Sequence, residues 1–497
     1  MVFSSSIFLF GFLPPVLVIY LLAGHISVRA RNLVLLLAGY VFYGWETPQY
    51  IPLMFATTSI DWAVSLVVAG DDWRIWRIWG EQLHPLPSTR AGTVRSLTQK
   101  RAIWLSVISN LAMLGYFKYF NFLFETYVSL LRASGHAGNT PTQWVWIILP
   151  LGISFYTFQS LSYTIDVYRG DAKAMGNFID FACFVSMFPH LVAGPILKFS
   201  FLAEQLEKRS VTVEKFARGV TFFALGLTKK VLIANTCATI ADAAFGASSV
   251  APKEAWWGAL AYAFQIFFDF SGYSDMAIGL GLMLGFVFAR NFDAPYRSLS
   301  VTDFWRRWHI SLSTWLREYL YIPLGGNRKG STRTYINLLL TMLLGGLWHG
   351  ASWTYVIWGA LHGCGLAWER WWAIRNKGRE PWAITKYLRP PLTFLFVLFG
   401  WVFFRATSWA RAMLFLQCML GIKAPSATAA VVAGMVYSPL QIWTMVLGVI
   451  AVWVLPDTWE WTQSLPAWKA VFCFGCLCGA LLIMSTQTYQ PFIYYIF

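Results

Sequence analysis

The sequence predicts an all-α membrane protein that crosses the bilayer many times. Of the 497 residues, 57% are hydrophobic and only 12% are charged, and apolar stretches of spanning length recur along the whole chain. A soluble domain carries about 25% charged residues, because its surface needs them. The composition therefore excludes a disordered protein and disfavours a soluble enzyme.

The apolar stretches follow one another almost from end to end. Backbone groups in lipid must be satisfied within their own segment, so each stretch is expected to be a helix. Shorter apolar pieces near 177–200 and 408–421 are expected to be re-entrant or interfacial helices. We expect roughly ten to thirteen spans, near 6–24, 32–47, 50–69, 103–131, 144–164, 216–247, 255–288, 335–349, 351–369, 390–405, 437–455 and 468–485.

Lys and Arg gather in alternate connections. They are dense in 70–102, 165–218 and 289–334, whereas 134–143 has none and 246–254 has only Lys253. Because basic loops stay in the cytoplasm, the N-terminus is predicted to lie outside, and the net charge of +15 reflects orientation and not nucleic-acid binding. Residues 1–497 are expected to form one integral-membrane domain without a separate soluble domain.

Ionisable residues are costly inside a membrane, so each one there is a candidate for function. The sequence has only seven histidines. Three lie in polar or interfacial surroundings: His25, His84 and His136. Four lie in apolar or mixed surroundings: His190, His309, His349 and His362. For His362, packing is the favoured interpretation.

His349 has the most unusual setting. Residues 334–368 contain no charged residue, and one straight helix over them would measure about 52 Å, whereas the hydrocarbon core is about 30 Å thick. The segment must therefore break, and the glycines of 345–350 mark the expected place. The break would bury His349 beside Trp348 and Trp353. A neutral imidazole there could take a proton from a hydroxyl or thiol; a packed histidine bonded to a carbonyl is the alternative.

His309 lies in a segment that predicts an amphipathic, aromatic and basic helix at the cytoplasmic interface. Ser300 and Asp303 are the expected capping pair at its start. Helical spacing places five aromatic or apolar residues on one stripe: Phe304, Trp308, Leu312, Trp315 and Tyr319. Arg306 and Arg307 could receive the phosphates of an anionic donor. An interfacial anchor helix is the alternative.

Three further polar features stand out in apolar surroundings. Asp269 and Asp275 could orient a histidine or a loop, or could form a proton or cation path in a transporter. His190 lies between Pro189 and Pro195, which predicts irregular backbone. Such backbone is tolerated at membrane depth only where it is buried in protein or faces a cavity.

No metal site is predicted. Cys473, Cys476 and Cys478 have a metal-like spacing, but no histidine or carboxylate lies near them in the sequence, so a plain apolar helix is expected. The H-E-x-x-H motif of zinc hydrolases and the G-x-S-x-G motif of lipase-like hydrolases are both absent.

These segments together resemble the membrane-bound O-acyltransferase (MBOAT) family, and within it the members that O-acetylate alginate; those that D-alanylate teichoic acid are more distant. The resemblance begins with Met1–Ser5 and weakens beyond about residue 405. It is carried by residues 149–156, 189–195, 269–281, 304–326 and 343–350, of which the last three are specific and occur in the family's order.

The resemblance implies a helical bundle around a transmembrane tunnel, with the family's core over roughly 103–405. It also implies that His349, in the W-H-G segment, is the catalytic residue and that His309, in the R-R-W-H segment, is a second functional histidine. We expect further substrate or tunnel residues among Arg306, Arg307, Trp308, Trp348, Asp269, Tyr273, Asp275 and His190.

The implied activity is transfer of an acetyl group from a cytoplasmic thioester, most simply acetyl-CoA, for O-acetylation of an extracellular polysaccharide such as alginate. The expected setting is the bacterial inner membrane. Expected partners are the acyl donor, the polysaccharide or a periplasmic acetyltransferase, and membrane lipid, with no nucleic acid and no bound cofactor. Two alternatives stay open: a transporter of acetyl groups or another solute, and a non-catalytic subunit of a polysaccharide synthesis complex.

Overall fold

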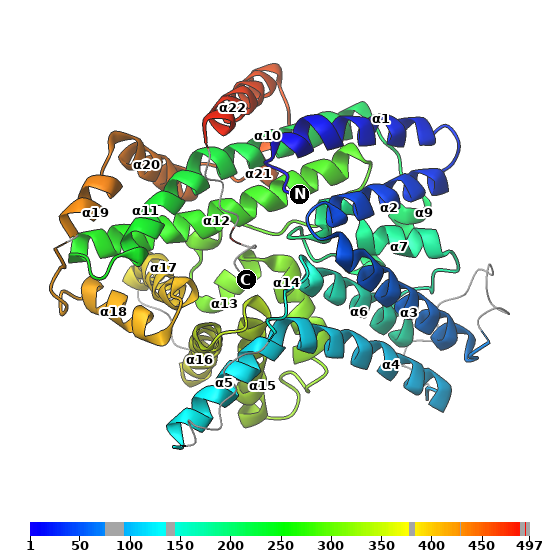
Figure 1. The fold of residues 1–497 in the computed structure, drawn as a ribbon, viewed down its shortest axis with the longest axis horizontal. Helices are drawn as coiled ribbons and strands as arrows, with labels where there is room; N and C mark the ends of the chain where they lie inside the picture. The colour runs from blue at the N-terminus through cyan, green and yellow to red at the C-terminus, as the bar shows by residue number, and fades with distance from the viewer. Residues whose placement is uncertain (75–93, 136–144, 377–382, 428, 488–492, 494–497) are drawn as a thin grey trace. The chain divides into compact units, whose positions relative to one another are not determined.

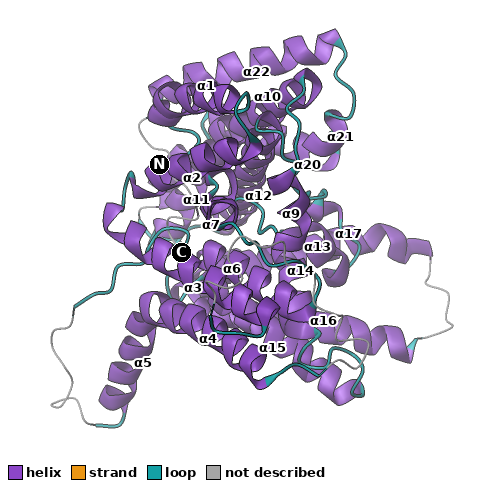
Figure 2. Ribbon diagram, turned by 90° about the vertical axis from the view of Figure 1, so that its right-hand side faces the viewer, coloured by secondary structure: helices purple, strands orange, loops and turns teal. Residues whose placement is uncertain are grey.

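A computed structural model describes residues 1–74, 94–135, 145–376, 383–427, 429–487 and 493. Within these ranges every regular element is a helix and no strand occurs, as Figures 1 and 2 show. The predicted all-α fold is confirmed. The polar loops that contain His84 and His136 lie outside the described residues.

The chain divides into two compact units. Unit 1 is Met1–Phe216 with Gly281–Phe288, and unit 2 is Ala217–Leu280 with Ala289–Phe497. Two of the three boundaries fall within helices, α10 (Val213–Thr228) and α12 (Pro252–Met283), and the third follows Phe288.

Unit 1 combines long helices with short helical pieces. In chain order these are η1 (Ile7–Phe12), α1 (Leu13–Ala23), α2 (Val28–Gly44), η2 (Pro48–Tyr50), α3 (Ile51–Gly70), α4 (Leu97–Leu114), η5 (Gly115–Tyr119), α5 (Phe120–Ala133), α6 (Ile153–Arg169), α7 (Phe178–Ser186), α8 (Phe188–Leu191) and α9 (Phe199–Glu207). The short α8 lies in the segment around His190 for which irregular backbone is predicted.

A buried polar cluster joins the helices of unit 1. The Asp61 carboxylate of α3 accepts hydrogen bonds from Ser106 Oγ at 2.6 Å and from Asn110 Nδ2 at 2.9 and 3.0 Å, both on α4. A carboxylate away from water is costly unless its oxygens have donors, so these bonds make Asp61 tolerable in the helix packing.

Unit 2 contains most of α10 and α12 and all of the C-terminal elements. These are η7 (Lys229–Ala234), α11 (Asn235–Gly246), η8 (Pro295–Arg297), α13 (Val301–Arg307), α14 (Ile310–Trp315), η9 (Leu316–Tyr321), α15 (Ser331–His349), α16 (Trp353–Arg375), α17 (Ala383–Arg405), α18 (Trp409–Met419), α19 (Ala429–Val436), α20 (Pro439–Trp453), α21 (Thr458–Trp461) and α22 (Ala467–Thr486).

Several described helices are long and apolar enough to cross a bilayer. Four single helices are both long enough and apolar enough: Pro48–Gly70, Val213–Gly246, Tyr387–Arg405 and Ala467–Thr486. The pair α19 and α20, bent by 64°, would make a fifth. This is fewer than the number of spans predicted. The predicted stretches include shorter or broken helices: a π-helix, η5, interrupts 103–131, and helix begins within 144–164 only at Ile153.

The break predicted around 345–350 is confirmed. α15 ends at His349, and Gly350 is extended, with φ −162° and ψ 145°. Ser352 then caps α16, its Oγ accepting a hydrogen bond from Thr354 N at 3.4 Å. The two helices pack along each other as a hairpin (Figure 1), and this hairpin holds His349 at its turn.

Two glycines allow close approach within the hairpin. A Cβ added to Gly346 would lie 2.2 Å from the carbonyl oxygen of Tyr355, and one added to Gly359 would lie 2.3 Å from that of Met342. Both distances are shorter than any real contact, so a side chain at either position must push the helices apart.

Gly346→Ala is therefore expected to lower the free energy of unfolding by roughly 1–3 kcal/mol. Gly345→Ala is the matched control, because its Cβ would meet only the flexible end of Leu316, at 3.2 Å. Thermal unfolding of the detergent-purified variants measures the difference. Equal stability of the two variants would contradict the close packing at Gly346.

Candidate functional site

The segment that carries His309 is not the single helix predicted from its periodicity. α13 ends at Arg307, Trp308 is extended (φ −98°, ψ 127°), and His309 has left-handed backbone angles (φ 43°, ψ 55°) before α14 begins. That conformation is uncommon outside glycine. The cap predicted at the start is present, since Ser300 Oγ accepts a hydrogen bond from Asp303 N at 3.0 Å.

Hydrogen bonds from the preceding loop explain the break. Asp293 N donates to Arg307 O and Ile310 N donates to Asn291 O, each at 2.9 Å. Backbone groups on both sides of the break thus find partners outside the helix. Periodicity along the sequence contains no information about such a partner. The prediction of one continuous helix is therefore wrong. The single stripe predicted along it is also wrong, and its residues were Phe304, Trp308, Leu312, Trp315 and Tyr319.

The His309 ring is completely buried. Its Nδ1 lies 3.2 Å from Asn291 Oδ1, and the ring of Phe270 forms a T-shaped pair with it, with centroids 4.6 Å apart. The second nitrogen, Nε2, is buried and has no hydrogen-bond partner among the described residues. His309 lies outside the spans given above. Burial, together with the neighbouring His349, holds the pKa of His309 well below its ordinary value, so the imidazole is neutral at neutral pH.

His349 lies in an aromatic enclosure and is only 5% exposed. The rings of Trp348, Trp358 and Phe404 surround it, with centroids 5.1, 5.2 and 5.3 Å away. The predicted burial and the predicted neighbour Trp348 are therefore confirmed. Trp353 was also expected to line this place, but its side chain, at the first residue of α16, is 55% exposed.

The fold brings the two histidines together. The ring centroids of His309 and His349 are 6.4 Å apart, and Trp348 lies beside both. Residues forty positions apart in the sequence thus form one buried pair of imidazoles. One bound group could contact both rings, as a site for proton transfer requires. The catalytic roles themselves stay predictions.

Other predicted site residues have structural partners. Trp308 is 2% exposed and stacks with Tyr296 and Phe304, so it is part of the aromatic core of unit 2. Tyr273 of α12 is likewise 2% exposed. In unit 1, His190 Nε2 donates to the carbonyl oxygen of Phe184 at 2.7 Å.

The two candidate arginines differ in their contacts. Arg307 Nε donates to Asp303 Oδ1 at 2.9 Å, and its Nη1 donates to the carbonyl oxygen of Asp293 at 3.3 Å. Arg306 is exposed. Arg307 is thus occupied by acidic and carbonyl oxygens, and Arg306 is the better candidate for contact with an anionic donor.

Each of the two conspicuous carboxylates of α12 pairs with a lysine of η7. Asp269 Oδ1 lies 2.6 Å from Lys230 Nζ, and Asp275 Oδ2 lies 2.7 Å from Lys229 Nζ. Asp269 also accepts a hydrogen bond from Ile493 N at 2.8 Å. Neither lysine was predicted as a site residue from the sequence, although two adjacent cations in the apolar stretch 216–247 are themselves a signal.

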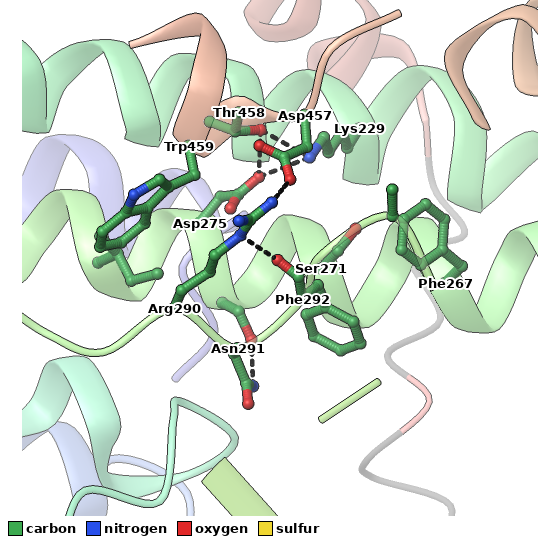
Figure 3. Close-up of a pocket in the computed structure, with 13 residues that line it drawn as sticks. Lys229, Phe267, Ser271, Asp275, Arg290, Asn291, Phe292, Asp457, Thr458 and Trp459 are labelled. Atoms are coloured by element: carbon green, nitrogen blue, oxygen red, sulfur yellow. Dashed lines mark hydrogen bonds and ion pairs between the residues drawn. The ribbon is translucent and has the colours of Figure 1, made fainter. Parts of the chain in front are cut away.

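A small cavity of about 30 Å³ lies between α12 and the C-terminal segment at α21 (Figure 3). Lys229, Asp275 and Thr458 form a hydrogen-bonded group on one side. Arg290 and Asn291 line another side. The cavity has room for one or two water molecules but not for an acyl donor. Asn291 connects this cavity to His309. It was missed because a neutral side chain in a loop matches no motif.

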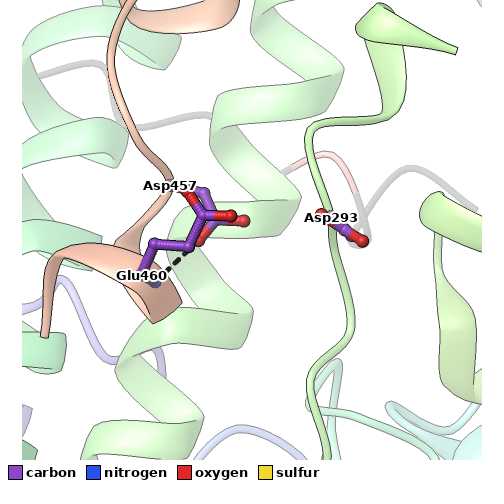
Figure 4. A group of neighbouring side chains, drawn as sticks. All are labelled: Asp293, Asp457 and Glu460. Atoms are coloured by element: carbon purple, nitrogen blue, oxygen red, sulfur yellow. Dashed lines mark hydrogen bonds between the residues drawn. The ribbon is translucent and has the colours of Figure 1, made fainter. Parts of the chain in front are cut away.

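Three carboxylates gather beside the cavity (Figure 4). Asp293, Asp457 and Glu460 each place an oxygen within 4.8 Å of the others. Arg290 Nη2 already pairs with Asp293 at 2.7 Å and with Asp457, and Asp457 Oδ1 accepts a hydrogen bond from Glu460 N at 2.9 Å. The group is therefore an ion-pair network with a guanidinium as its cation.

His362 is packed among aromatic rings, which is the role favoured from its sequence. It is completely buried, and its Nδ1 accepts a hydrogen bond from Trp305 Nε1 at 3.2 Å. Phe304 and Trp358 contact the ring, with centroids 6.0 and 4.9 Å away.

Comparison with known proteins identifies the family. The membrane-bound O-acyltransferase profile matches residues 171–410. A Pseudomonas aeruginosa protein named probable alginate O-acetylase AlgI is 50% identical over 406 residues, which cover 82% of this chain and 72% of the relative. The chain belongs to the membrane-bound O-acyltransferase family. It is thus a multi-pass membrane protein and an O-acyltransferase.

Two relatives with other names are also similar in sequence to this chain. A peptidoglycan O-acetyltransferase of Helicobacter pylori is 35% identical over 459 residues, covering 86% of this chain and 81% of the relative. A teichoic acid D-alanyltransferase of Streptococcus thermophilus is 30% identical over 259 residues, covering 46% of this chain and 60% of the relative. The order of likeness predicted from the sequence, with the alginate members ahead of the teichoic acid members, is confirmed.

Proposed function

We propose that this O-acyltransferase moves an acetyl group from a cytoplasmic thioester, most simply acetyl-CoA, to a hydroxyl group for O-acetylation of an extracellular polysaccharide. The names alginate O-acetylase and peptidoglycan O-acetyltransferase among the relatives support the acetyl group and the polymer. The hydroxyl belongs to the polymer or to a periplasmic acetyltransferase that passes the group on. The alternation of basic and neutral loops supports a bacterial inner membrane location with the N-terminus outside.

The observation that carries the proposal is the buried pair of His309 and His349. Their ring centroids lie 6.4 Å apart in an aromatic enclosure. In the proposed reaction His349 removes the hydroxyl proton as the oxygen attacks the thioester carbonyl. The carbon–sulfur bond then breaks, and the thiolate takes the proton from the His349 imidazolium. The surrounding rings exclude water, which would otherwise hydrolyse the thioester.

A transporter that uses Asp269 and Asp275 as a proton path is less well supported. Each carboxylate already has a lysine within 2.7 Å, and proton movement through it would leave a buried cation (Lys230) or a half-buried one (Lys229) without its counter-charge. A non-catalytic scaffold would have no need for two buried imidazoles at one place.

The test uses a strain that lacks this chain. Mass spectrometry of its extracellular polymer is expected to show loss of O-acetyl groups, and expression of the wild-type chain is expected to restore them. An unchanged acetyl content in the deletion strain would contradict the proposed function.

Arg306 and Arg307 are expected to respond differently to replacement by alanine. Arg306→Ala should raise KM for a CoA thioester by about 3- to 10-fold with little change in kcat, because it removes binding without touching the reacting atoms. The effect should shrink at high salt, which screens the charges. Arg307→Ala should mainly lower stability, since it removes the contacts with Asp303 and Asp293. Initial rates over donor concentration check this; an unchanged KM for Arg306→Ala would contradict it.

A further inference from the structure

We infer that Asn291 is a positioning residue: its side-chain oxygen holds His309 in the tautomer that carries its proton on Nδ1, so that Nε2 meets the substrate as a hydrogen-bond acceptor. The inference rests on the proposed acyl transfer and extends it to one residue outside the histidine pair. It also restricts the chemistry of whatever group binds at Nε2.

The orientation of the Asn291 amide follows from its neighbours. Ser311 N lies 3.2 Å from the Asn291 atom that faces His309, and a backbone N–H can only donate, so that atom must be the oxygen. Ser311 Oγ donates to the same oxygen at 2.9 Å; its single hydrogen is used there, at the shorter distance, so toward His309 Nδ1, 3.4 Å away, the hydroxyl can only accept. On the other side Asn291 Nδ2 donates to Ser274 Oγ of α12 at 3.0 Å. Both ends of the amide are thus fixed.

The fixed amide determines the proton on His309. The Asn291 oxygen lies 3.2 Å from His309 Nδ1. If Nδ1 had a lone pair, two lone pairs would face each other in a buried place, at a cost in free energy. Nδ1 therefore donates to Asn291, and the neutral ring has its lone pair on Nε2, the buried atom without a partner among the described residues.

The backbone supports the same arrangement. Asn291 O accepts the hydrogen bond from Ile310 N that stabilises the left-handed turn at His309. One loop residue therefore sets the backbone of His309 through its carbonyl group and the ring through its side chain. Only the second role is removed when the side chain is changed.

The lone pair on Nε2 limits the ligand. It can bind only a group that carries a hydrogen, such as a sugar hydroxyl or an amide N–H of a thioester arm. A carbonyl or phosphate oxygen would meet a second lone pair. The structure thus favours a hydroxyl-bearing acceptor, or the amide part of the donor, at this side of the histidine pair.

Two substitutions at Asn291 test the inference in the purified full-length chain, with acetyl-CoA as donor and deacetylated alginate as acceptor. Asn291→Ala should lower kcat by roughly 10- to 100-fold, since the ring loses its tautomer and orientation, with KM for acetyl-CoA nearly unchanged. Asn291→Asp keeps an acceptor oxygen and should recover part of kcat. Ser274→Ala is the matched comparison: it removes the contact at the far end of the amide but leaves the oxygen at His309, so it should lower kcat far less than Asn291→Ala.

The pH profile separates positioning from a purely structural role. The aspartate of Asn291→Asp would favour the imidazolium form of His309 and raise its pKa, and the reaction needs the neutral form. The acidic limb of the kcat profile should therefore move to higher pH by at least about one unit. Among the described residues, the titratable group that acts on His309 across the site is His349, and it is unchanged in the variant.

Imidazole ¹⁵N NMR of the wild-type chain provides a test that does not depend on how the Asn291 variants fold. With His309 signals assigned by loss in His309→Asn, a protonated Nδ1 and a bare Nε2 are expected. A protonated Nε2, or Asn291 variants with the wild-type pH profile and activity lowered only in proportion to folded protein, would overturn the inference. Absence of transfer to alginate by the wild-type chain would instead count against the part of the proposed function in which the polymer itself is the acceptor.

Discussion

Replacement of His349 by asparagine is expected to lower the rate of O-acyl transfer by about 10²- to 10⁴-fold, the usual contribution of a general base. Asparagine has an amide of similar reach but cannot take a proton at neutral pH. His349 is 5% exposed and enclosed by Trp348, Trp358 and Phe404, so bulk water cannot easily take over its role. The acetyl content of the polymer, at matched membrane levels of protein, measures the loss.

The same substitution at His362 is the matched control. His362 lies on the partner helix of the same hairpin, and its Nδ1 only accepts a hydrogen bond from Trp305. An asparagine oxygen can accept that bond, so His362→Asn is expected to keep most of the activity. If both variants lose activity equally, packing and not proton transfer explains the effect at His349.

Replacement of His309 by asparagine is expected to have the second-largest effect, a loss of roughly 10²-fold. Asparagine tolerates the left-handed backbone at this position better than most residues, so the change removes the ring without adding strain. It also removes the acceptor Nε2. Steady-state rates of the purified variant, with donor and acceptor varied in turn, measure the effect.

The double variant of His309 and His349 shows whether the two rings act as one unit. If they do, the double variant should be little slower than His349→Asn alone. Once one member of a catalytic unit has been removed, removal of the other lowers the rate only slightly further. If the rate loss of the double variant instead equals the product of the losses of the two single variants, the rings do not act as one site, although their centroids are only 6.4 Å apart.

The place of His349 can be predicted from the sequence because it follows from the length of one uncharged stretch. A stretch without charge that is too long for one crossing must break, and the glycines of 345–350 show where; the structure breaks at Gly350. Burial follows, since the break lies inside an apolar segment. What length cannot show is which rings come from other helices, so Trp358 and Phe404 were not foreseen.

The helix predicted around His309 fails for a different reason. Its apolar periodicity is genuine, but hydrogen bonds from Asn291 and Asp293 at the break compete with the helical ones. Such bonds depend on a loop brought close by the fold. The same loop contains Asn291, which no spacing or charge distinguishes in the sequence, although it determines the geometry of the site.

Acyl transfer at the histidine pair is tested most directly by following acetyl groups through the reconstituted chain. Proteoliposomes receive radiolabelled acetyl-CoA on one side and deacetylated alginate on the other. The wild-type chain is predicted to give labelled, alkali-sensitive acetyl esters on the acceptor, and His349→Asn to give none at equal protein content. Equal labelling by His349→Asn, or entry of label into vesicles that contain no acceptor, would contradict acyl transfer at the histidine pair.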